Sequence, residues 1–330
     1  MVEITRTSAR FFSMLGQSGA MFGVALIEYC NEGNDVVVIS ADMAIPAGLG
    51  KFKKKYPEHF YNVGIAEQNL VGVAAGMASE TLPVIASAQA CFLSMRSFEQ
   101  VRQYSGYMSI PVIYVGVSSG FSLTFFGNTH YALEDISLMR NIPGMTVLAP
   151  SDAGQAAKLL ELALEQNTPC YIRCTGVPGQ APFYTKDIDV SVGGSTTVVS
   201  GTDIVVFCTG SIIRNAKSAI EKINKSSHIS IALLDMYSLM PIDTEALVDS
   251  VGAKAWVSIE EHFVTGGLGG ILSEYIASVR SYKKPILYRL GVDSEFTTPG
   301  EYEYLLESNQ LDDEGIKESL LAVIEVINCD

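Results

Sequence analysis

The stretch that decides the fold is Phe60-Tyr-Asn-Val-Gly-Ile-Ala-Glu-Gln-Asn-Leu-Val-Gly-Val-Ala-Ala-Gly-Met-Ala78. Glu67 is its only charged residue, and it stands where a loop turns into an apolar helix rich in glycine and alanine. Such small residues let another backbone or another polypeptide approach closely. A carboxylate withdrawn from water favours its protonated form, which suits acid–base catalysis near neutral pH. The other interpretation is a first-turn glutamate that stabilises the helix N-terminus.

Outward from this stretch, short apolar runs typical of strands alternate with helical patterns. This order predicts βαβ units and a parallel sheet that is covered by helices on both faces. The expected strands of the first half are 35–40, 82–87, 111–116, 145–149 and 169–173, and the expected helices are 11–30, 67–80, 94–107 and 152–166.

The amino-acid composition changes between residues 176 and 200, where glycine and proline stand among polar residues. We therefore expect two α/β domains, 1–178 and 201–330, joined by a linker at 179–200. The second domain is predicted to have strands 204–208, 230–234 and 255–259 and helices 212–224, 243–252 and 267–279.

The chain has 330 residues, 48% of them hydrophobic and 18% charged, with a net charge of −14. This composition predicts a well-cored globular protein and argues against a nucleic-acid partner. The six cysteines form no CxxC pair, which favours buried reduced thiols over a metal site. The start lacks a signal-peptide layout, and the longest nearly apolar run, 65–78, is too short to span a bilayer. We expect a soluble cytoplasmic protein without membrane contact.

Several motifs together resemble one known family. Asn62-Val-Gly-Ile-Ala-Glu-Gln-Asn69 resembles the pyrimidine-domain signature of the transketolase family. Further similar segments cover most of the chain: Ile39-Ser-Ala-Asp-Met43, Asn128-Thr-His-Tyr-Ala-Leu-Glu-Asp135, 139–152 and Glu260-Glu-His-Phe-Val-Thr-Gly-Gly-Leu-Gly269. The sequence is most similar to the separately encoded C-terminal subunit of split transketolases. The resemblance implies a pyrimidine-binding domain followed by a transketolase C-terminal domain.

The resemblance also implies roles for individual residues. Glu67 would hydrogen-bond the aminopyrimidine ring of thiamine diphosphate and promote the tautomer that activates the thiazolium carbon, while Phe92 would pack on the ring. His130 would handle the oxygen atoms of the substrate. Core packing is the alternative for Phe92, and a purely structural role is the alternative for His130 and is favoured for His262, at the interface between domains.

Further cofactor contacts are expected from residues around the same slot. They are Gln89, Met95, Ile65 and Asp42, of which Asp42 lies at the carboxyl end of a parallel strand, where ligands bind in open α/β sheets. A helix cap is the alternative for Asp42.

The sequence contains no Gly-Asp-Gly, the motif through which the family binds diphosphate and its divalent metal. The resemblance therefore implies a partner, an N-terminal transketolase-like subunit that holds the diphosphate and Mg²⁺ or Ca²⁺. No metal ligand is assigned to this chain, and a heterotetramer of two copies of each chain is expected.

Three departures from the family concern the substrate. Gly19 and Gly176 align with two phosphate-recognising arginines, and Phe126 aligns with an acidic residue. Because arginine recognises phosphate through two parallel hydrogen bonds, its loss predicts that the acceptor is not an ordinary pentose phosphate. A nucleotide-linked keto-sugar or a secondary-metabolite precursor is the expectation.

The leading hypothesis is a transferase that moves a two-carbon ketol or acyl unit from a sugar or 2-oxo donor to a carbonyl acceptor. The alternatives are a β-subunit of a 2-oxoacid dehydrogenase, an enzyme like deoxyxylulose-phosphate synthase, and a non-catalytic scaffold paralogue. The joint presence of Glu67, Phe92 and His130 argues against the scaffold.

Overall fold

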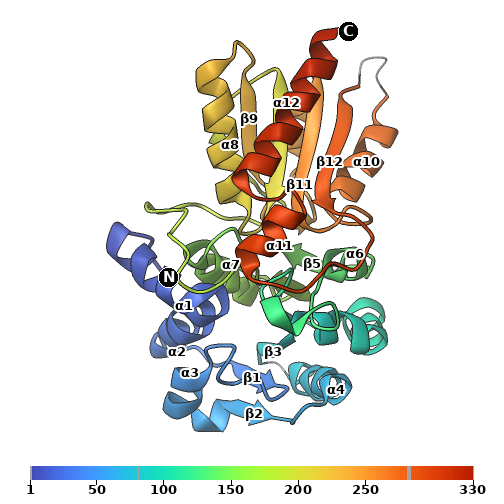
Figure 1. Ribbon diagram of the computed structural model, residues 1–330. Helices are drawn as coiled ribbons and strands as arrows, with labels where there is room; N and C mark the ends of the chain where they lie inside the picture. Colours follow the sequence, from blue (N-terminus) through green and yellow to red (C-terminus); the bar gives the residue numbers. More distant parts are fainter. Residues whose placement is uncertain (1, 81, 281–283, 330) are drawn as a thin grey trace.

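The computed structural model describes residues 2–80, 82–280 and 284–329 and consists of two stacked α/β halves (Figure 1). The N-terminal half forms the lower part of the view and the C-terminal half the upper part. Each half is built on one mostly parallel sheet, which confirms the predicted fold class.

The first sheet has seven strands in the order β10-β5-β6-β4-β3-β1-β2. Its strands are β1 Val37–Ser40, β2 Phe60–Asn62, β3 Val84–Gln89, β4 Val112–Val117, β5 Thr146–Leu148, β6 Cys170–Arg173 and β10 Ser238–Met240. All neighbours are parallel except β10, which runs antiparallel to β5. Every residue of β3 and β4 is buried, as expected for a sheet with helices on both faces.

The helices of this half are α1 Arg6–Ala20, η1 Met21–Ala25, α2 Leu26–Asn31, α3 Gly50–Lys55, η2 Pro57–His59, α4 Glu67–Ala78, η3 Phe92–Arg96, α5 Phe98–Val101, η4 Arg102–Tyr107, η5 Thr124–Phe126, α6 Asp135–Met139 and α7 Ala153–Gln166. The predicted helix 11–30 begins earlier, at Arg6, and is broken at Gly16, whose φ is 72°. The predicted helix 94–107 is interrupted by the π-helical segments η3 and η4.

Within the described residues, one helical stretch, Arg6–Asn31, has the length and composition of a membrane span. It packs on α7, and Met21, Phe22 and Leu26 are buried in the same apolar cluster as residues of β1 and α7. The core helix of a folded domain passes the same test, so this stretch carries no membrane assignment.

The second sheet has five strands in the order β12-β11-β8-β9-β7. The strands are β7 Thr196–Val199, β8 Ile204–Thr209, β9 Ile231–Asp235, β11 Ala255–Phe263 and β12 Ile286–Val292. The helices are α8 Ile213–Ser226, α9 Thr244–Ser250, α10 Leu268–Ser278, α11 Tyr302–Ser308 and α12 Asp313–Cys329. Apolar residues of α8 and α12 cover one face of this sheet, and those of α9 and α10 cover the other.

Two elements lie across the predicted domain boundaries, which stay a prediction. The end of the predicted linker 179–200 forms β7, which pairs antiparallel with β9 at the edge of the second sheet. Strand β10, which falls inside the predicted second domain 201–330, joins the first sheet instead. Both halves also share buried apolar clusters, since Phe121, Tyr131 and Leu133 pack with residues of β8 and α8.

Candidate active site

The site is built around the first residue of α4. Glu67 is only 3% exposed, because the apolar residues that follow it, among them Leu70, Val71 and Ala74, draw the helix onto the sheet. Gly64 adopts a φ of 75° in the preceding loop, a conformation that glycine enters without strain. The chain thus turns sharply from β2 into α4 and places a carboxylate at the start of the helix.

Arg96 pairs with this carboxylate. Its Nη1 atom donates to Glu67 Oε2 at 2.8 Å, and its guanidinium lies 4.1 Å from the centre of the Phe92 ring. Gln68 fixes the arginine backbone by donating to the Arg96 carbonyl at 3.1 Å. The Arg96 side chain is 46% exposed, so it lies between the buried carboxylate and the solvent.

His130 lies on the other side of Phe92. The His130 ring is 5.4 Å from the Phe92 ring, edge to face, and 5.1 Å from the Phe126 ring. Gln89, at the end of β3, donates to the His130 carbonyl at 3.3 Å, and Thr129 Oγ1 lies 2.9 Å from His130 Nδ1. Segments from three parts of the sequence therefore form one continuous cluster of a carboxylate, an aromatic ring and an imidazole.

The other three predicted cofactor residues lie at the margin of this cluster. Asp42 is exposed at the end of β1 with a φ of 57°, and its Oδ1 atom accepts a hydrogen bond from Asn62 at 3.2 Å. It caps no helix, because α3 begins later, after Leu49. Ile65 is 76% exposed and Met95 is 42% exposed.

The structure shows what surrounds Gly19 and Gly176, the two glycines that align with arginines of the family. A Cβ atom added at Gly48 would lie 2.6 Å from the Gly19 Cα atom, so these backbones pack directly on each other. Gly176 has a φ of 75°, and a Cβ atom there would meet Ser211 of the second half at 2.9 Å. At Gly176, the close approach of the second half takes the room that a long side chain would need, whereas a Cβ atom added at Gly19 would meet only the Leu15 Cβ atom, at 3.0 Å.

His262 is fully buried between the halves. Burial lowers the pKa of His262 to about 4, so its ring is neutral near pH 7. Its Nδ1 atom lies 2.6 Å from the Phe263 carbonyl, and its Nε2 atom lies 3.5 Å from the backbone nitrogen of Ser137. These contacts agree with the expected position at the domain interface.

The residue that the sequence analysis missed is Arg96. It follows Phe92 by four positions, which is one helical turn, and this spacing alone would have placed its side chain beside that ring. No group of three or more residues that could hold a metal ion is found within the part of the chain that the structure describes.

Two family models match the chain and together cover most of it: "Transketolase, pyrimidine binding domain" over residues 17–176 and "Transketolase, C-terminal domain" over residues 193–316. These matches place the chain among the thiamine-diphosphate-dependent transferases. The chain belongs to the transketolase family.

Individual relatives match the chain from end to end. It is 33% identical to the "Putative transketolase C-terminal section" of Methanocaldococcus jannaschii, over 91% of this chain and 94% of that protein. It is 31% identical to a subunit of the apulose-4-phosphate transketolase of Phocaeicola vulgatus, over 92% of this chain and 96% of that protein. Among solved structures, "Split gene transketolase, inactive beta4 tetramer" matches with a TM-score of 0.82 and 33% identity, over 92% of this chain and 97% of that one. The chain therefore resembles these three proteins over 94–97% of their length.

Proposed function

We propose that this chain supplies the pyrimidine half of the active site of a two-chain transketolase-like enzyme. The observation that carries the proposal is the cluster of Glu67, Phe92 and His130, which the fold assembles from three separate segments. The enzyme would move a two-carbon ketol or acyl unit from a ketose or 2-oxo donor to a carbonyl acceptor.

The residues of the cluster fit the aminopyrimidine ring of thiamine diphosphate. A ring of this kind needs an aromatic surface to stack on and a carboxylate that reaches a ring nitrogen. Phe92 offers the surface, and Glu67 offers an almost fully buried carboxylate whose side-chain partner is the half-exposed Arg96. When bound, thiamine diphosphate supplies the carbanion chemistry of the reaction.

The chain's own residues divide the remaining work. Glu67 would hydrogen-bond the ring nitrogen of the bound cofactor, and burial would strengthen this bond because little water competes for it. His130, held by Gln89 and flanked by two phenyl rings, is placed to donate to or accept from the substrate oxygen. Gln89, Met95, Ile65 and Asp42 would border the slot.

The diphosphate and its Mg²⁺ or Ca²⁺ would be held by a partner, an N-terminal transketolase-like subunit, in an α2β2 heterotetramer. Large apolar side chains exposed around the cluster support a partner surface here, namely Ile65, Met95, Phe125 and Phe126. The description of the similar split transketolase structure as an inactive tetramer of β chains also supports the view that this chain needs its partner for activity.

The acceptor is proposed to differ from an ordinary pentose phosphate. Gly176 packs too closely on Ser211 to be replaced by arginine, Gly19 offers no cationic side chain, and Phe126 adds an exposed apolar ring 5.1 Å from the His130 ring. A larger or less polar carbonyl compound would fit beside the apolar Phe126 ring. Efficient turnover of xylulose 5-phosphate with ribose 5-phosphate by the reconstituted enzyme would remove this part of the proposal.

Replacing Glu67 tests the central claim. In the complex with the N-terminal subunit, Glu67→Gln is expected to lower kcat by roughly 10²- to 10⁴-fold, the range that a positioned acid–base group contributes. The matched control is Glu99→Gln, because Glu99 is an exposed glutamate near Arg96 on α5. Loss of activity in the first variant and full activity in the second supports the proposal, whereas equal activity in both favours a scaffold role.

A further inference from the structure

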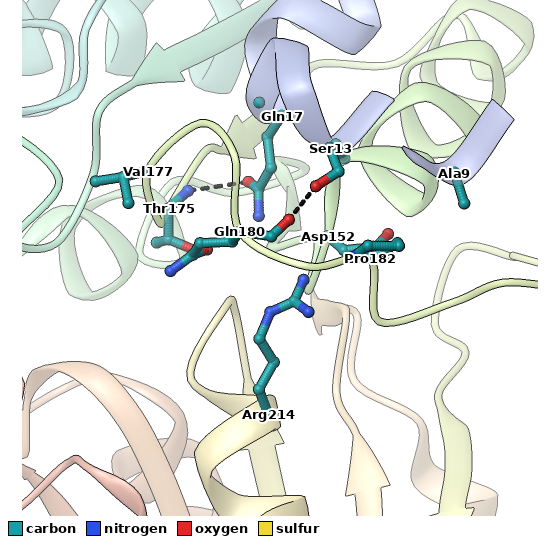
Figure 2. Close-up of a pocket in the computed structure, with 11 residues that line it drawn as sticks. Ala9, Ser13, Gln17, Asp152, Thr175, Val177, Gln180, Pro182 and Arg214 are labelled. Atoms are coloured by element: carbon teal, nitrogen blue, oxygen red, sulfur yellow. Dashed lines mark hydrogen bonds between the residues drawn. The ribbon is translucent and has the colours of Figure 1, made fainter. Parts of the chain in front are cut away.

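The two halves of the chain meet in more than one place. Where β6 and β8 end, Arg214 extends from α8 toward the first half and lies near Asp152, beside the hydrogen bond from the Thr175 backbone to Gln17 (Figure 2). Another contact joins segment 293–300 of the second half to the His130 loop, residues 122–131. This second contact concerns the candidate active site directly.

Segment 293–300 lies between β12 and α11, which both belong to the second half. In Figure 1 the chain descends here from the end of β12 onto the first half before it enters α11. The residues on either side of the segment are buried, with Val292 1% exposed and Tyr302 3% exposed. Tyr302 also donates to Glu261 Oε2 at 2.6 Å. The second half therefore holds the segment at both ends, while its middle lies on the first half.

Asn128 joins the segment to the His130 loop. Its Nδ2 atom donates to the Thr297 carbonyl at 2.8 Å, and its Oδ1 atom accepts from the Thr297 backbone nitrogen at 3.2 Å. A side-chain amide that both donates to and accepts from one backbone residue reproduces the paired bonds of two antiparallel strands. The two bonds together fix the direction of the Asn128 side chain as well as its distance from the segment.

Two further neighbours of His130 touch the same segment. A Cβ atom added at Gly127 would lie 3.0 Å from Pro299 Cγ, so the loop backbone packs directly on that ring. The Gly300 backbone acts on the Tyr131 hydroxyl, because burial raises the pKa of this group and a hydrogen bond from Gly300 opposes the rise. The segment thus contacts the loop on both sides of His130.

The position of the His130 ring depends on the position of this loop. Outside the loop, Gln89 bonds the His130 carbonyl at 3.3 Å and the Phe92 ring lies 5.4 Å from the imidazole. Two closer neighbours, Thr129 with its hydroxyl 2.9 Å from Nδ1 and Phe126 with its ring 5.1 Å away, belong to the loop itself. Because they move with the loop, they cannot fix the imidazole relative to Phe92.

We propose that segment 293–300 supports the substrate site and that Asn128 is the positioning residue through which the segment holds His130. This inference rests on the proposed function, in which His130 contacts the substrate oxygen. Asn128 itself touches neither substrate nor cofactor; it fixes the loop against the second half so that the imidazole lies in place. A displacement of about 1 Å at a reacting group can cost roughly 10²-fold in rate, so the loss of this contact should be measurable.

Kinetics of the two-chain complex give the first test, with hydroxypyruvate as the 2-oxo donor. Asn128→Ala is expected to lower kcat/KM by roughly 10- to 100-fold. Its affinity for thiamine diphosphate should equal that of wild type, because Glu67 and Phe92 are unchanged. The matched control is Asn34→Ala, since Asn34 is an exposed asparagine that donates to the Tyr29 carbonyl at 3.1 Å. This control should keep the wild-type kinetics.

Nitrogen-15 spectra of the imidazole rings give a second readout, which needs no turnover and uses the full chain alone. The chain has four histidines, and His130→Gln identifies the signals that belong to His130. In Asn128→Ala the His130 nitrogen shifts should move toward those of a free imidazole, because the ring loses its fixed surroundings. The signals of the other three rings should stay in place, namely those of His59, His228 and His262.

A second variant separates the two hydrogen bonds from the volume of the side chain. Asn128→Asp keeps the size of asparagine, but at pH 7 it directs a carboxylate oxygen at the Thr297 carbonyl, which then has no donor. It should lose activity and move the His130 signals as Asn128→Ala does. Wild-type behaviour of Asn128→Asp, with a loss in Asn128→Ala, would make the position a matter of packing and overturn the inference.

The two readouts distinguish failure of this inference from failure of the proposed function. An inactive wild-type complex, together with His130 signals that move in Asn128→Ala, would refute the proposed function and support the positioning of His130 by Asn128. His130 signals that stay in place, or wild-type kcat/KM in an active complex of Asn128→Ala, would overturn the inference and leave the proposed function intact.

Discussion

At the scale of single residues, Arg96 covers the surfaces that the cofactor would use in the proposed site. The guanidinium covers the Phe92 ring at 4.1 Å and bonds Glu67 at 2.8 Å, and the proposed aminopyrimidine ring needs both groups. A half-exposed ion pair and a cation–π contact are each worth about 1 kcal/mol or less. Arg96→Met is therefore expected to tighten thiamine diphosphate binding to the two-chain complex by about fivefold, measured by fluorescence titration.

The control for this variant is Arg102→Met, because Arg102 is an exposed arginine six residues further along the same helical segment. It should bind the cofactor with wild-type affinity. Weaker binding by Arg96→Met than by wild type would show that the arginine assists the cofactor instead of competing with it.

The residues of the site differ in how far the sequence could predict them. Glu67 and His130 stand in long motifs that resemble those of the family, and the structure brings both close to Phe92. Arg96 stands outside these motifs, and its role appears only when the segment 92–96 is folded against α4. A motif identifies a side chain by its neighbours in sequence, whereas an ion pair between positions 67 and 96 depends on the backbone path between them.

At the scale of elements, the helix predicted at 94–107 shows why local pattern has limits. Its apolar spacing fits a regular helix, yet η3 and η4 are π-helical. Ser94 donates to the Ala90 carbonyl and Ser97 donates to the Leu93 carbonyl, both at 2.7 Å. Serine hydroxyls that bond the carbonyl four residues back bend helices, and π turns often accompany functional sites. Phe92 and Arg96 are the first and last residues of η3, and their side chains are in contact.

The start of α10 provides a prediction at this scale. Glu260 is fully buried and accepts from the backbone nitrogens of Leu268 at 2.7 Å and Gly269 at 2.8 Å. Gly267 is required there, since an added Cβ atom would lie 1.9 Å from Glu260 Oε2. Burial raises the pKa of Glu260 from 4.5 to about 7, while these backbone bonds lower it.

A raised pKa in the folded state means that the stability from Glu260 is fully present below pH 4.5 and is lost as the pH rises through 7. Glu260→Gln resembles the protonated acid, so its free energy of unfolding should fall less than that of wild type between pH 5 and pH 8. Urea unfolding at several pH values measures the two slopes. Glu274→Gln, an exposed position on α10, should keep the wild-type slope. Identical slopes in all three proteins would contradict the role of Glu260.

At the scale of the whole molecule, the two halves are joined more closely than the sequence suggested. Strand β10 leaves the second half and pairs with β5, where Ser238 lies opposite Leu148. The Tyr237 carbonyl extends this pairing by accepting from the Ala149 backbone at 2.8 Å. Alternation of strands and helices predicted two parallel sheets, but a pairing between residues about ninety positions apart leaves no local pattern to read.

Replacing a residue of a buried ion pair at the domain interface tests whether the two halves stabilise each other. Arg173 and Asp135 are both fully buried, with Arg173 Nε 2.9 Å from Asp135 Oδ2, and Tyr171 also donates to Asp135 at 2.8 Å. Arg173 reaches the second half by donating to the Glu261 carbonyl at 2.8 Å. Asp135→Asn would leave the guanidinium buried without this counter-charge, so a loss of about 3–5 kcal/mol is expected in urea unfolding. The exposed pair of Lys217 and Glu221 is the control, and Glu221→Gln should leave stability within experimental error.

The number of transitions in the unfolding curve shows whether the two halves unfold together. Because Arg173 binds both halves, weakening it should destabilise them together and keep a single transition at a lower urea concentration. Adding Arg173→Met to Asp135→Asn should cost less than the sum of the two single changes, since the arginine has already lost its partner. Two separate transitions in Asp135→Asn would mean that the halves fold independently and that neither β10 nor the buried pair couples them.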